Sequence, residues 1–361
     1  MVTSECVIVG GGPAGLSAAK ELLEAGARVT IIDRNERLGG QLIKQTHMFF
    51  GSEKQYASHR GIDILEYLVN DLAPYGDRLE IRTGTTVAAI YQDKVLGCLK
   101  DEKYFKIKAE SVIIATGASE KALPFENNDL PGVYAAGAVQ TLMNEYGIKP
   151  GQKVLMVGSG NIGLIVGYQL LQAGIEVKAL VEAADRIGGY LVHASKLRRL
   201  GVPVLPKTSI KRAIGKDAVE AAEIWSLDEN WQGIPGTEKK LDVDTICIAV
   251  GLSPLTELLQ QTGVRVEYVR ELGGNVPLLD EGYRTTVDKV YACGDVANIE
   301  EASSAMVEGR ITGIHAARDL GHEVENARFR IKALQHELYD LRGGPPGEKV
   351  RQGIKKREVL A

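Results

Sequence analysis

The residues best suited to chemistry near the start of the chain are three glycines and one acid. The glycines follow a short apolar run with the spacing Gly10-x-Gly12-x-x-Gly15, and Asp33 ends the next apolar run. The first glycine of such a motif makes a tight turn, the second lets the backbone approach a pyrophosphate, and the third lets a helix pack on a strand. The N–H groups that open the helix then face phosphate charge. The pattern predicts a dinucleotide site; the alternative is a glycine-rich turn without a ligand.

The same pattern returns 148 residues later, from Gly10 to Gly158. Gly158-x-Gly160-x-x-Gly163 again follows an apolar run, and Glu182 ends the next one. Each copy then leads through alternating runs, typical of a β-meander, to an apolar strand and a tight turn. The repeat is too long for a solenoid. It indicates a duplicated nucleotide-binding domain.

The elements that must position these motifs follow from apolar periodicity. We expect strands at 6–9, 29–32 and 111–114, helices at 16–25 and 59–73, and meanders at 79–108 and 210–241. After residue 251 the chain differs: a strand ends in Gly294-Asp295, a helix of small residues follows, and an amphipathic helix covers 324–341 before the chain breaks at 343–346 and ends basic. The expected fold class is α/β, with two Rossmann-like domains, each a parallel sheet with helices and a β-meander. The second domain is inserted in the first, so the expected domains are 1–117 with 252–325, then 118–251, and a C-terminal helix and basic tail at 326–361.

Composition excludes several functions. The net charge of −4 over 361 residues gives no electrostatic case for nucleic acid binding. The four cysteines are scattered and form no C-x-x-C pair, which argues against a redox dithiol and against a zinc or iron–sulfur site. The run 154–171 is poor in charge but interrupted by glycines, so we expect no membrane span. With a strand at the very start and no room for a signal peptide, the expected location is the cytoplasm.

Two glycine motifs, two Ala-Thr-Gly-like turns and the terminal Tyr-Ala-Cys-Gly-Asp together resemble the two-dinucleotide-binding-domain FAD/NAD(P) oxidoreductases over residues 1–325. Length and the run Gly39-Gly40-Gln41-Leu42 are similar to the thioredoxin-reductase-like branch. The absence of C-x-x-C departs from that branch, so we expect no disulfide reduction. The loop KQTHMFFGS, the runs 272–278 and 299–309, and the closing LRGGPPGEK resemble more closely the FAD/NAD subunit of amine and amino-acid dehydrogenase complexes. These include sarcosine oxidase alpha, opine and hydroxyproline dehydrogenases, and hydrogen cyanide synthase.

The resemblance implies two cofactors, FAD and NAD, each with its own contacts. The implied FAD contacts are Gly10, Gly12, Pro13, Ala14, Gly15, Asp33, Arg34, Gly40, Gln41, Val87, Ala115, Thr116, Gly117, Gly294, Asp295, Ala302 and Ser303. The implied pyridine-nucleotide contacts are Gly158, Gly160, Asn161, Ile162, Gly163, Glu182, Val250 and Gly251. An acid at Glu182 favours the free ribose hydroxyl of NAD over the phosphate of NADP, although Arg186 could serve a phosphate. The alternative is a degenerate second site that holds ATP, ADP or nothing.

Flavin and nicotinamide carry the hydride chemistry, so the protein must bind, orient and exclude water. The helix after Asp295 is expected to direct its N-terminus at the flavin and stabilise charge on the reduced ring. Thr46 and His47 are the candidates for lining the flavin; the alternative is that His47 and His59 are structural loop histidines. We expect Phe49 and Phe50 to serve packing or an interface.

Three functions fit these observations. The first is a subunit that passes electrons between NAD and a partner amine or amino-acid dehydrogenase, with any iron–sulfur cluster on a partner chain. The second is a stand-alone NAD(P)H reductase that feeds ferredoxin or a quinone, and the third is a structural subunit that only holds a nucleotide. A homo-oligomer is compatible with all three. The apolar stripe on the last predicted helix suggests docking to a partner subunit. The alternative is a solvated tail, or packing of this segment on its own domain.

Overall fold

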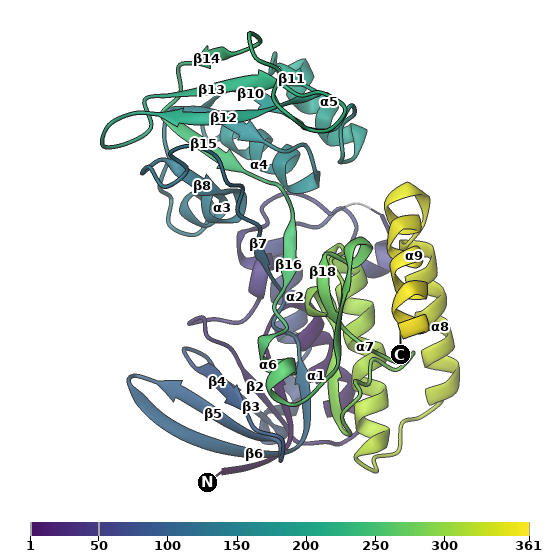
Figure 1. Cartoon of the computed structure of the whole chain (residues 1–361). Helices are drawn as coiled ribbons and strands as arrows, with labels where there is room; N and C mark the ends of the chain where they lie inside the picture. Colours follow the sequence, from purple (N-terminus) through teal and green to yellow (C-terminus); the bar gives the residue numbers. More distant parts are fainter. Residues whose placement is uncertain (1, 50, 361) are drawn as a thin grey trace. The chain divides into compact units, whose positions relative to one another are not determined.

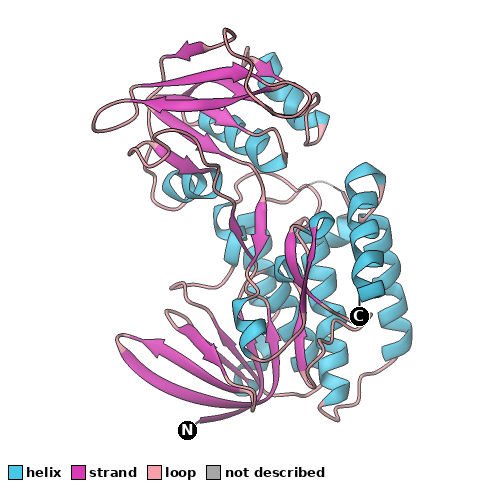
Figure 2. Cartoon of the chain, viewed as in Figure 1, coloured by secondary structure: helices cyan, strands magenta, loops and turns pink. Residues whose placement is uncertain are grey.

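A parallel sheet of strongly apolar strands carries the first glycine turn. In the computed structural model, which describes residues 2–49 and 51–360, β1 (Val2–Val9) pairs in parallel with β2 (Val29–Ile32) and β6 (Lys103–Ile114). The half of β1 from residue 6 onward is buried, as are all four residues of β2. Strands covered on both faces read as continuous apolar runs, which is why the sequence reveals them. The α/β fold class predicted from the sequence is confirmed (Figures 1 and 2).

Strand β6 belongs to two parts of the same sheet. Its second half lies parallel to β1 and to β19 (Val290–Ala292), and β3 (Leu79–Arg82) extends the parallel part beyond β2. Its first half is antiparallel to β5 (Val95–Lys100), which pairs with β4 (Thr86–Ile90). The expected meander is therefore made of β4, β5 and the start of β6, whereas residues 79–82 join the parallel strands.

Two helices pack unusually closely beside this sheet. Helix α1 (Pro13–Glu24) follows the glycine turn, and α7 (Ala302–Asp319) lies against it. A Cβ on Gly309 of α7 would overlap the carbonyl oxygen of Ala14, so glycine is needed there for the backbones to meet. This contact brings the sequence that follows Gly294 to the start of α1.

The chain divides into two compact units. Unit 1 comprises 2–119 and 253–360 among the described residues, and unit 2 comprises 120–252. The two connecting segments form a short ribbon, β7 (Ala118–Glu120) with β16 (Leu252–Pro254).

Unit 2 repeats the plan of unit 1 on a smaller scale. Its parallel sheet has the order β11-β10-β9-β15-β8, and an antiparallel sheet, β12-β13-β14, corresponds to the second predicted meander. The strands are β8 (Val133–Ala135), β9 (Lys153–Val157), β10 (Glu176–Val181), β11 (Val204–Leu205), β12 (Thr208–Ile214), β13 (Ala221–Ser226), β14 (Lys239–Leu241) and β15 (Thr245–Ile248). The helices are α3 (Ala136–Asn144), α4 (Asn161–Gln172) and α5 (Leu191–Arg199).

Unit 1 also contains smaller elements that complete its surface. These are α2 (Gly61–Asn70), α6 (Glu257–Gln261) and the hairpin of β17 (Val266–Val269) and β18 (Gly274–Pro277). Short 3-10 helices lie at Gly40–Lys44, Glu53–Gln55, Ala73–Arg78, Arg270–Leu272 and Gly294–Val296. Within 2–49 and 51–360, no helix combines the length and the apolar character that a membrane crossing requires.

The C-terminal residues form two helices rather than one helix and a basic tail. Helix α8 (Ala327–Leu341) is followed after a two-residue break by α9 (Gly344–Leu360), and both belong to unit 1 (Figure 1). Ile331, Leu334 and Leu338 are buried in the core of unit 1. The apolar stripe therefore packs on its own unit, and the expectation that it offers a docking face for a partner is wrong.

Candidate functional site

The first glycine turn is shaped by close backbone contacts. Gly10 has a φ of +108°, and its N–H donates to the carbonyl of Ile32 at 2.8 Å. A Cβ at Gly10 would overlap the carbonyl oxygen of Ala115, and one at Gly15 would overlap that of Gly10. The backbone of Ala115 and Thr116 therefore lies directly against the first glycine.

Asp33 is fixed beside this turn. Its side chain is 6% exposed. One carboxylate oxygen accepts from the Gly11 N–H at 2.8 Å and the other from the Asn35 N–H at 2.8 Å. The neighbouring Arg34 is exposed. The acid is thus held in one orientation by backbone donors while its remaining lone pairs are available to a ribose.

The run at 39–41 lies on the other side of the turn. The Gly39 N–H donates to the Gly11 carbonyl at 2.7 Å, and a Cβ at Gly40 would come within 2.9 Å of the Gly12 Cα. Gln41 is exposed. In contrast, a Cβ at Gly12 would meet only the Gly40 Cα, at 3.8 Å, so one side of Gly12 is open.

Gly294 and Asp295 lie at the start of α1, where α7 crosses it. Gly294 has a φ of +76°, and a Cβ there would be 2.8 Å from the Ala14 Cβ. Asp295 is half-buried, and its carboxylate accepts from the Glu300 N–H at 3.3 Å. Burial, together with three nearby glutamates, raises the pKa of Asp295 to about 7, against the opposing effect of the hydrogen bond from Glu300.

These contacts give unit 1 a cradle that fits FAD. The first turn of α1 carries no side-chain cap and no acid, and α7, which starts at Ala302 and Ser303, has no side-chain cap either. Unpaired N–H groups at a helix start attract phosphate. Open glycine backbone, an acid fixed beside the turn and a second acid near the helix start form the kind of donor and acceptor set that a dinucleotide needs.

The second glycine turn has the same construction. Gly158 has a φ of +104°, and its N–H donates to the Val181 carbonyl at 2.9 Å. A Cβ at Gly158 would overlap the Ala249 carbonyl oxygen, and one at Gly163 would overlap that of Gly158. A Cβ at Gly160 would meet no atom within 4 Å. The open position is again the second glycine of the motif.

Glu182 is bound to this turn more tightly than Asp33 is to the first. One oxygen accepts from the Ser159 N–H at 2.9 Å and from the Ser159 hydroxyl at 2.5 Å, and the other accepts from the Ala184 N–H at 2.9 Å. Ser159 is fully buried, and its hydroxyl also accepts from the Gly188 N–H at 3.0 Å. Ser159 was not among the predicted site residues, although a hydroxyl between the first two motif glycines was visible in the sequence.

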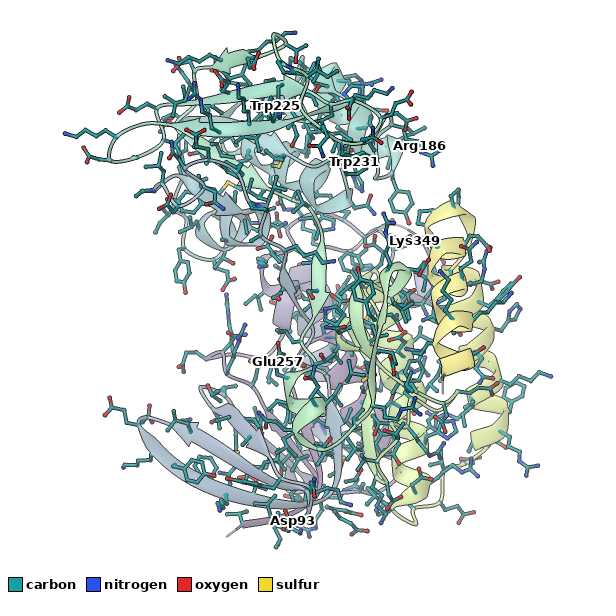
Figure 3. The ribbon with its side chains drawn as sticks, in the orientation of Figure 1. Asp93, Arg186, Trp225, Trp231, Glu257 and Lys349 are labelled. Carbon is teal, nitrogen blue, oxygen red and sulfur yellow. The ribbon has the colours of Figure 1, made fainter. Side chains whose placement is uncertain are left out.

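The loop after Glu182 is fastened to the glycine turn. The Gly189 N–H donates to the Ser159 carbonyl at 2.8 Å, as Gly39 does to Gly11 in unit 1. The Tyr190 N–H donates to the Asn161 side chain at 2.8 Å. Arg186 is exposed on unit 2 (Figure 3). Ile162 and Val250 are 36% and 37% exposed and Gly251 is also exposed, so the rim of this turn is apolar.

Three predicted site residues are not brought to a glycine turn by any contact described for them. Val87 lies on β4 opposite Cys98, half-buried in the core. The Thr46 carbonyl accepts from Arg60 at 3.1 Å, and the His47 ring stacks on Phe49 with centroids 5.8 Å apart. For Thr46 and His47 the contacts are those of an anchored loop.

Other residues of that loop have structural roles or cannot be described. His59 shares a hydrogen bond of 3.2 Å with the Tyr67 hydroxyl. Phe50 lies outside the described residues.

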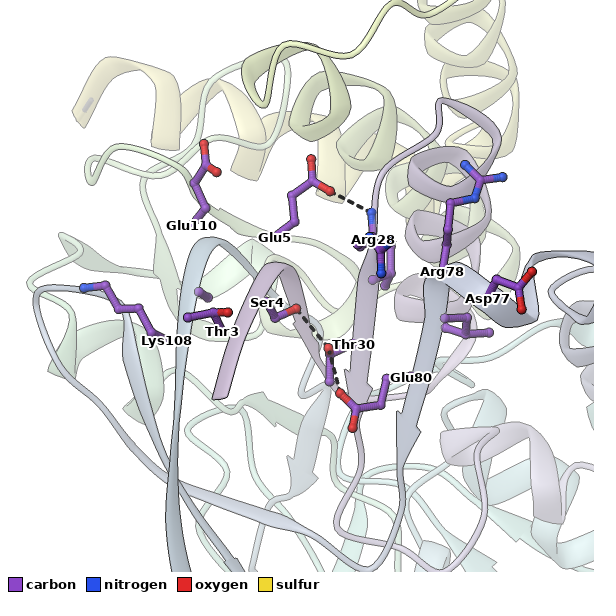
Figure 4. A pocket seen from close by; sticks show the side chains of 13 residues that line it. Thr3, Ser4, Glu5, Arg28, Thr30, Asp77, Arg78, Glu80, Lys108 and Glu110 are labelled. Carbon is purple, nitrogen blue, oxygen red and sulfur yellow. Dashed lines mark hydrogen bonds between the residues drawn. The ribbon is translucent and has the colours of Figure 1, made fainter. Parts of the chain in front are cut away.

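A mixed-charge hollow elsewhere on unit 1 is separate from the glycine turn. It is lined by the amino ends of β1, β2 and β3 and by residues 108–110 of β6 (Figure 4). Several of its polar side chains are hydrogen-bonded to one another: Ser4 shares a hydrogen bond of 2.9 Å with Thr30, and Thr30 donates to Glu80 at 3.3 Å. Ligands of parallel sheets bind at the carboxyl ends of the strands, so this hollow is at the wrong edge.

Metal and thiol chemistry find no support among the described residues. No group of three or more His, Cys, Asp or Glu side chains within 2–49 and 51–360 is arranged to hold a metal ion. All four cysteines are free and buried, and burial raises the pKa of each thiol. A thiol held neutral is a poor nucleophile.

Curated relatives of the chain are components of oxidases and synthases. It is 27% identical over 334 residues to hydrogen cyanide synthase subunit HcnB of Pseudomonas protegens, an alignment that covers 85% of this chain and 69% of the relative. It is 25% identical to an opine oxidase subunit of Agrobacterium tumefaciens, with 88% and 66% covered. It is 25% identical to the alpha subunit of sarcosine oxidase from a Corynebacterium species, with 89% and 33% covered. The chain thus spans about two thirds of the first two relatives and one third of the last.

Solved structures and a family model agree with the fold. Thioredoxin reductase from T. acidophilum matches with a TM-score of 0.72 at 23% identity, covering 88% of this chain and 99% of that one. L-proline dehydrogenase from P. horikoshii matches with a TM-score of 0.70 at 24% identity, covering 94% and 59%. The family model described as pyridine nucleotide-disulphide oxidoreductase matches residues 4–319. Because that match covers most of the sequence, the chain belongs to the pyridine nucleotide-disulphide oxidoreductase family, whose members are oxidoreductases that bind FAD and a pyridine nucleotide.

Proposed function

We propose that the chain is an FAD-dependent, NAD-linked oxidoreductase subunit that exchanges electrons with a partner amine or amino-acid dehydrogenase. The observation that carries the proposal is the pair of glycine turns, each with its second glycine open and an acid held against it by backbone N–H groups. FAD, when bound, supplies the chemistry of accepting or releasing a hydride.

Unit 1 would hold FAD through its cradle. The N–H groups at the start of α1 would bind the pyrophosphate, Asp33 would accept hydrogen bonds from the adenosine ribose, and Asp295 would bind the remaining polar chain. The start of α7, at Ala302 and Ser303, would place N–H groups and the positive end of the helix dipole near charge that develops on reduction.

Unit 2 would bind NAD rather than NADP. Glu182 places a carboxylate at the end of β10, where it would accept from the two ribose hydroxyls and repel a phosphate. The bonds from Ser159 and Ala184 fix that carboxylate, so a bound phosphate could not push it aside without breaking them. Arg186 is exposed and four residues further along the chain, and it is the residue on which the NADP alternative depends.

The partner is inferred from the names of the relatives and from chemistry that this chain lacks. The matching proteins named above are called subunits of hydrogen cyanide synthase, opine oxidase and sarcosine oxidase. The two glycine turns would bind nucleotides, and the residues assigned to them would not select an amine, an amino acid or a quinone. A second chain would therefore supply the organic substrate site and, where one is used, an iron–sulfur cluster.

Nucleotide selection is tested by the rate of anaerobic flavin reduction with NADH and with NADPH, for the wild type and for Glu182→Gln. We expect NADH to be preferred by the wild type, and the preference to fall about tenfold in the variant because one fixed charge is lost. Glu229→Gln, an exposed acid of unit 2, is the matched control. Equal rates with both nucleotides in the wild type would contradict the assignment of Glu182.

The partner is tested by purifying the tagged chain from its native cells. We expect a second flavoprotein to purify with it, and an amine or amino acid oxidised by that protein to reduce the flavin of this chain. A chain that purifies alone and passes electrons from NADH to ferredoxin or a quinone at full rate would instead be a stand-alone reductase.

A further inference from the structure

The C-terminal helices α8 and α9 lie beyond residues 4–319, which the family model matches. The segment that joins these helices nevertheless supplies a buried cation near the Gly294-Asp295 turn of unit 1. Arg342 follows the last residue of α8, and its side chain is 10% exposed. Its Nε donates to both carboxylate oxygens of Glu300, at 3.0 and 3.1 Å. Its terminal nitrogen donates to Glu300 at 2.5 Å and to Glu308 at 2.6 Å. One guanidinium thus joins two carboxylates.

Glu308 connects this guanidinium to the turn. Its side chain is 1% exposed, and the oxygen that does not contact Arg342 accepts from the Gly294 N–H at 2.9 Å. The other oxygen also accepts from Asn298 at 3.1 Å. The Glu300 N–H in turn donates to Asp295. Gly294 is therefore hydrogen-bonded to Glu308, and Asp295 to Glu300. Arg342 binds the carboxylates of both glutamates.

Charged groups of both signs lie around Glu308. Asp295 and Glu300 are the neighbouring acids, Glu301 lies near Asp295, and Cys293 and Tyr283 are buried beside Glu308. The facing cations are Arg342 and Arg357, and Arg357 is 4% exposed and donates to the Ala297 carbonyl at 3.3 Å. Burial raises the pKa of Glu308, and Arg342 opposes that rise. A buried carboxylate deprived of its partner takes up a proton or disturbs its surroundings.

The helices that carry Arg342 are anchored over a wide area of unit 1. On α8, Glu337 pairs with Lys54 at 2.8 Å and accepts from Gln55 at 3.0 Å, while Arg330 pairs with Glu21 of α1. On α9, Lys356 pairs with Glu271, and Val350 packs in a small core with Leu272. The guanidinium is therefore held in place from several directions at once.

We propose that Arg342 is a positioning residue for the FAD site, which holds Glu308 and Glu300 in place so that they keep the Gly294-Asp295 turn in its ligand-binding shape. The inference rests on the proposed binding of FAD by unit 1. It assigns a role to the segment that joins the two C-terminal helices.

The test measures FAD affinity by the quenching of flavin fluorescence, at pH 8.0 and at pH 5.5, for the wild type and Arg342→Met. At pH 8.0 the unpaired carboxylates repel the FAD phosphates and distort the turn, so we expect affinity to fall about tenfold or more. Burial raises the pKa of Glu308, so without Arg342 this carboxylate takes up a proton more readily as the pH falls, and at pH 5.5 we expect the loss to shrink to about threefold or less.

Two further variants distinguish positioning from general stabilisation. Lys332→Met removes an exposed cation from the same helix, and we expect FAD affinity to be unchanged at both pH values. Arg342→Lys keeps the charge without the fork that reaches two carboxylates, and we expect an intermediate, pH-dependent loss. Arg342→Lys also carries the test if Arg342→Met does not fold.

The outcomes separate this inference from the function on which it rests. Wild-type protein that binds no FAD would overturn both. Wild-type protein that binds FAD, with Arg342 variants that bind equally well or lose affinity equally at both pH values, would overturn the role of Arg342 alone.

Discussion

Replacing Asp295 by asparagine should stabilise the FAD-free protein, above all at alkaline pH. Burial raises the pKa of the Asp295 carboxyl from 3.8 to about 7. The unfolded chain therefore releases this proton at lower pH than the folded chain does, and folding stability is lost as pH rises between the two values. The cost is absent below the unfolded pKa and complete above the folded pKa. Asparagine carries no charge, so the Asp295→Asn variant does not have this cost.

The magnitude follows from the difference in pKa. From 3.8 to about 7 is roughly three units, and at about 1.36 kcal/mol per unit the ceiling is about 4 kcal/mol. Asp295 is only half-buried, so solvent screening reduces the effect, and we expect about 2 kcal/mol at pH 8. At pH 4.5 we expect about a third of that gain, because the cost accumulates as the pH rises from 3.8 to about 7 and pH 4.5 lies near the start of that range.

The assay is urea unfolding of FAD-free protein at both pH values, followed by far-ultraviolet circular dichroism. Tryptophan fluorescence is unsuitable, since Trp225 and Trp231 both lie in unit 2. Asp288→Asn, an exposed acid in the same segment, is the control and should change stability by less than about 0.5 kcal/mol. The reasoning is refuted if Asp295→Asn lowers the unfolding free energy at pH 8, or raises it equally at pH 4.5. The same variant should bind FAD more weakly if Asp295 has the proposed role.

Three further substitutions test other contacts. Gly160→Ala should leave the melting temperature unchanged, because the added methyl meets no atom within 4 Å. It should nevertheless weaken pyridine-nucleotide binding, measured by titration calorimetry. An unchanged affinity would contradict the nucleotide site proposed for unit 2. Gly309→Ala should lower the unfolding free energy by about 1–3 kcal/mol, because the added methyl would overlap the backbone of α1. Gly76→Ala, which has open space around it, should not lower the unfolding free energy by that amount. Equal effects of the two substitutions would contradict the close contact between α1 and α7. Leu334→Ala, at a 2% exposed position of α8, should cost about 2–5 kcal/mol in denaturant unfolding, and Phe329→Ala, at a 77% exposed one, less than about 0.5 kcal/mol. A larger loss of stability in Phe329→Ala than in Leu334→Ala would contradict the packing of the apolar stripe on unit 1.

The glycine turns were predictable because their causes are local. A left-handed φ at Gly10 and Gly158 requires glycine, and buried parallel strands read as apolar runs that end in an acid. The duplication then gave the fold class and the order of elements. Helix and strand limits differ from expectation by only a few residues, as for α1 and α2.

The helix expected at 324–341 corresponds to α8, whereas α9 was missed because the local signals there conflict with tertiary packing. Gly343 to Pro346 reads as a chain break, yet α9 begins at Gly344, because prolines are tolerated in the first turn of a helix, where N–H groups are unpaired anyway. The basic residues of α9 suggested a solvated tail. In the structure Val350 and Arg357 face unit 1 while lysines lie outside.

The networks around Ser159 and Arg342 could not be predicted for a different reason. Each joins residues far apart in sequence: Ser159 contacts Glu182, 23 positions away, and Arg342 contacts Glu300, 42 positions away. No periodicity encodes such a pair, since it depends on how helices and loops meet. Both networks supply the second layer of contacts that fixes the residues the motifs reveal.

The most direct test of the central claim is an anaerobic visible spectrum of the purified protein, before and after NADH is added. We predict flavin bands that correspond to one FAD per chain, and rapid bleaching of those bands by NADH. Protein that shows no flavin bands, even after incubation with FAD, would contradict the site assigned to unit 1. Bands that persist in NADH and in NADPH would contradict hydride delivery from unit 2.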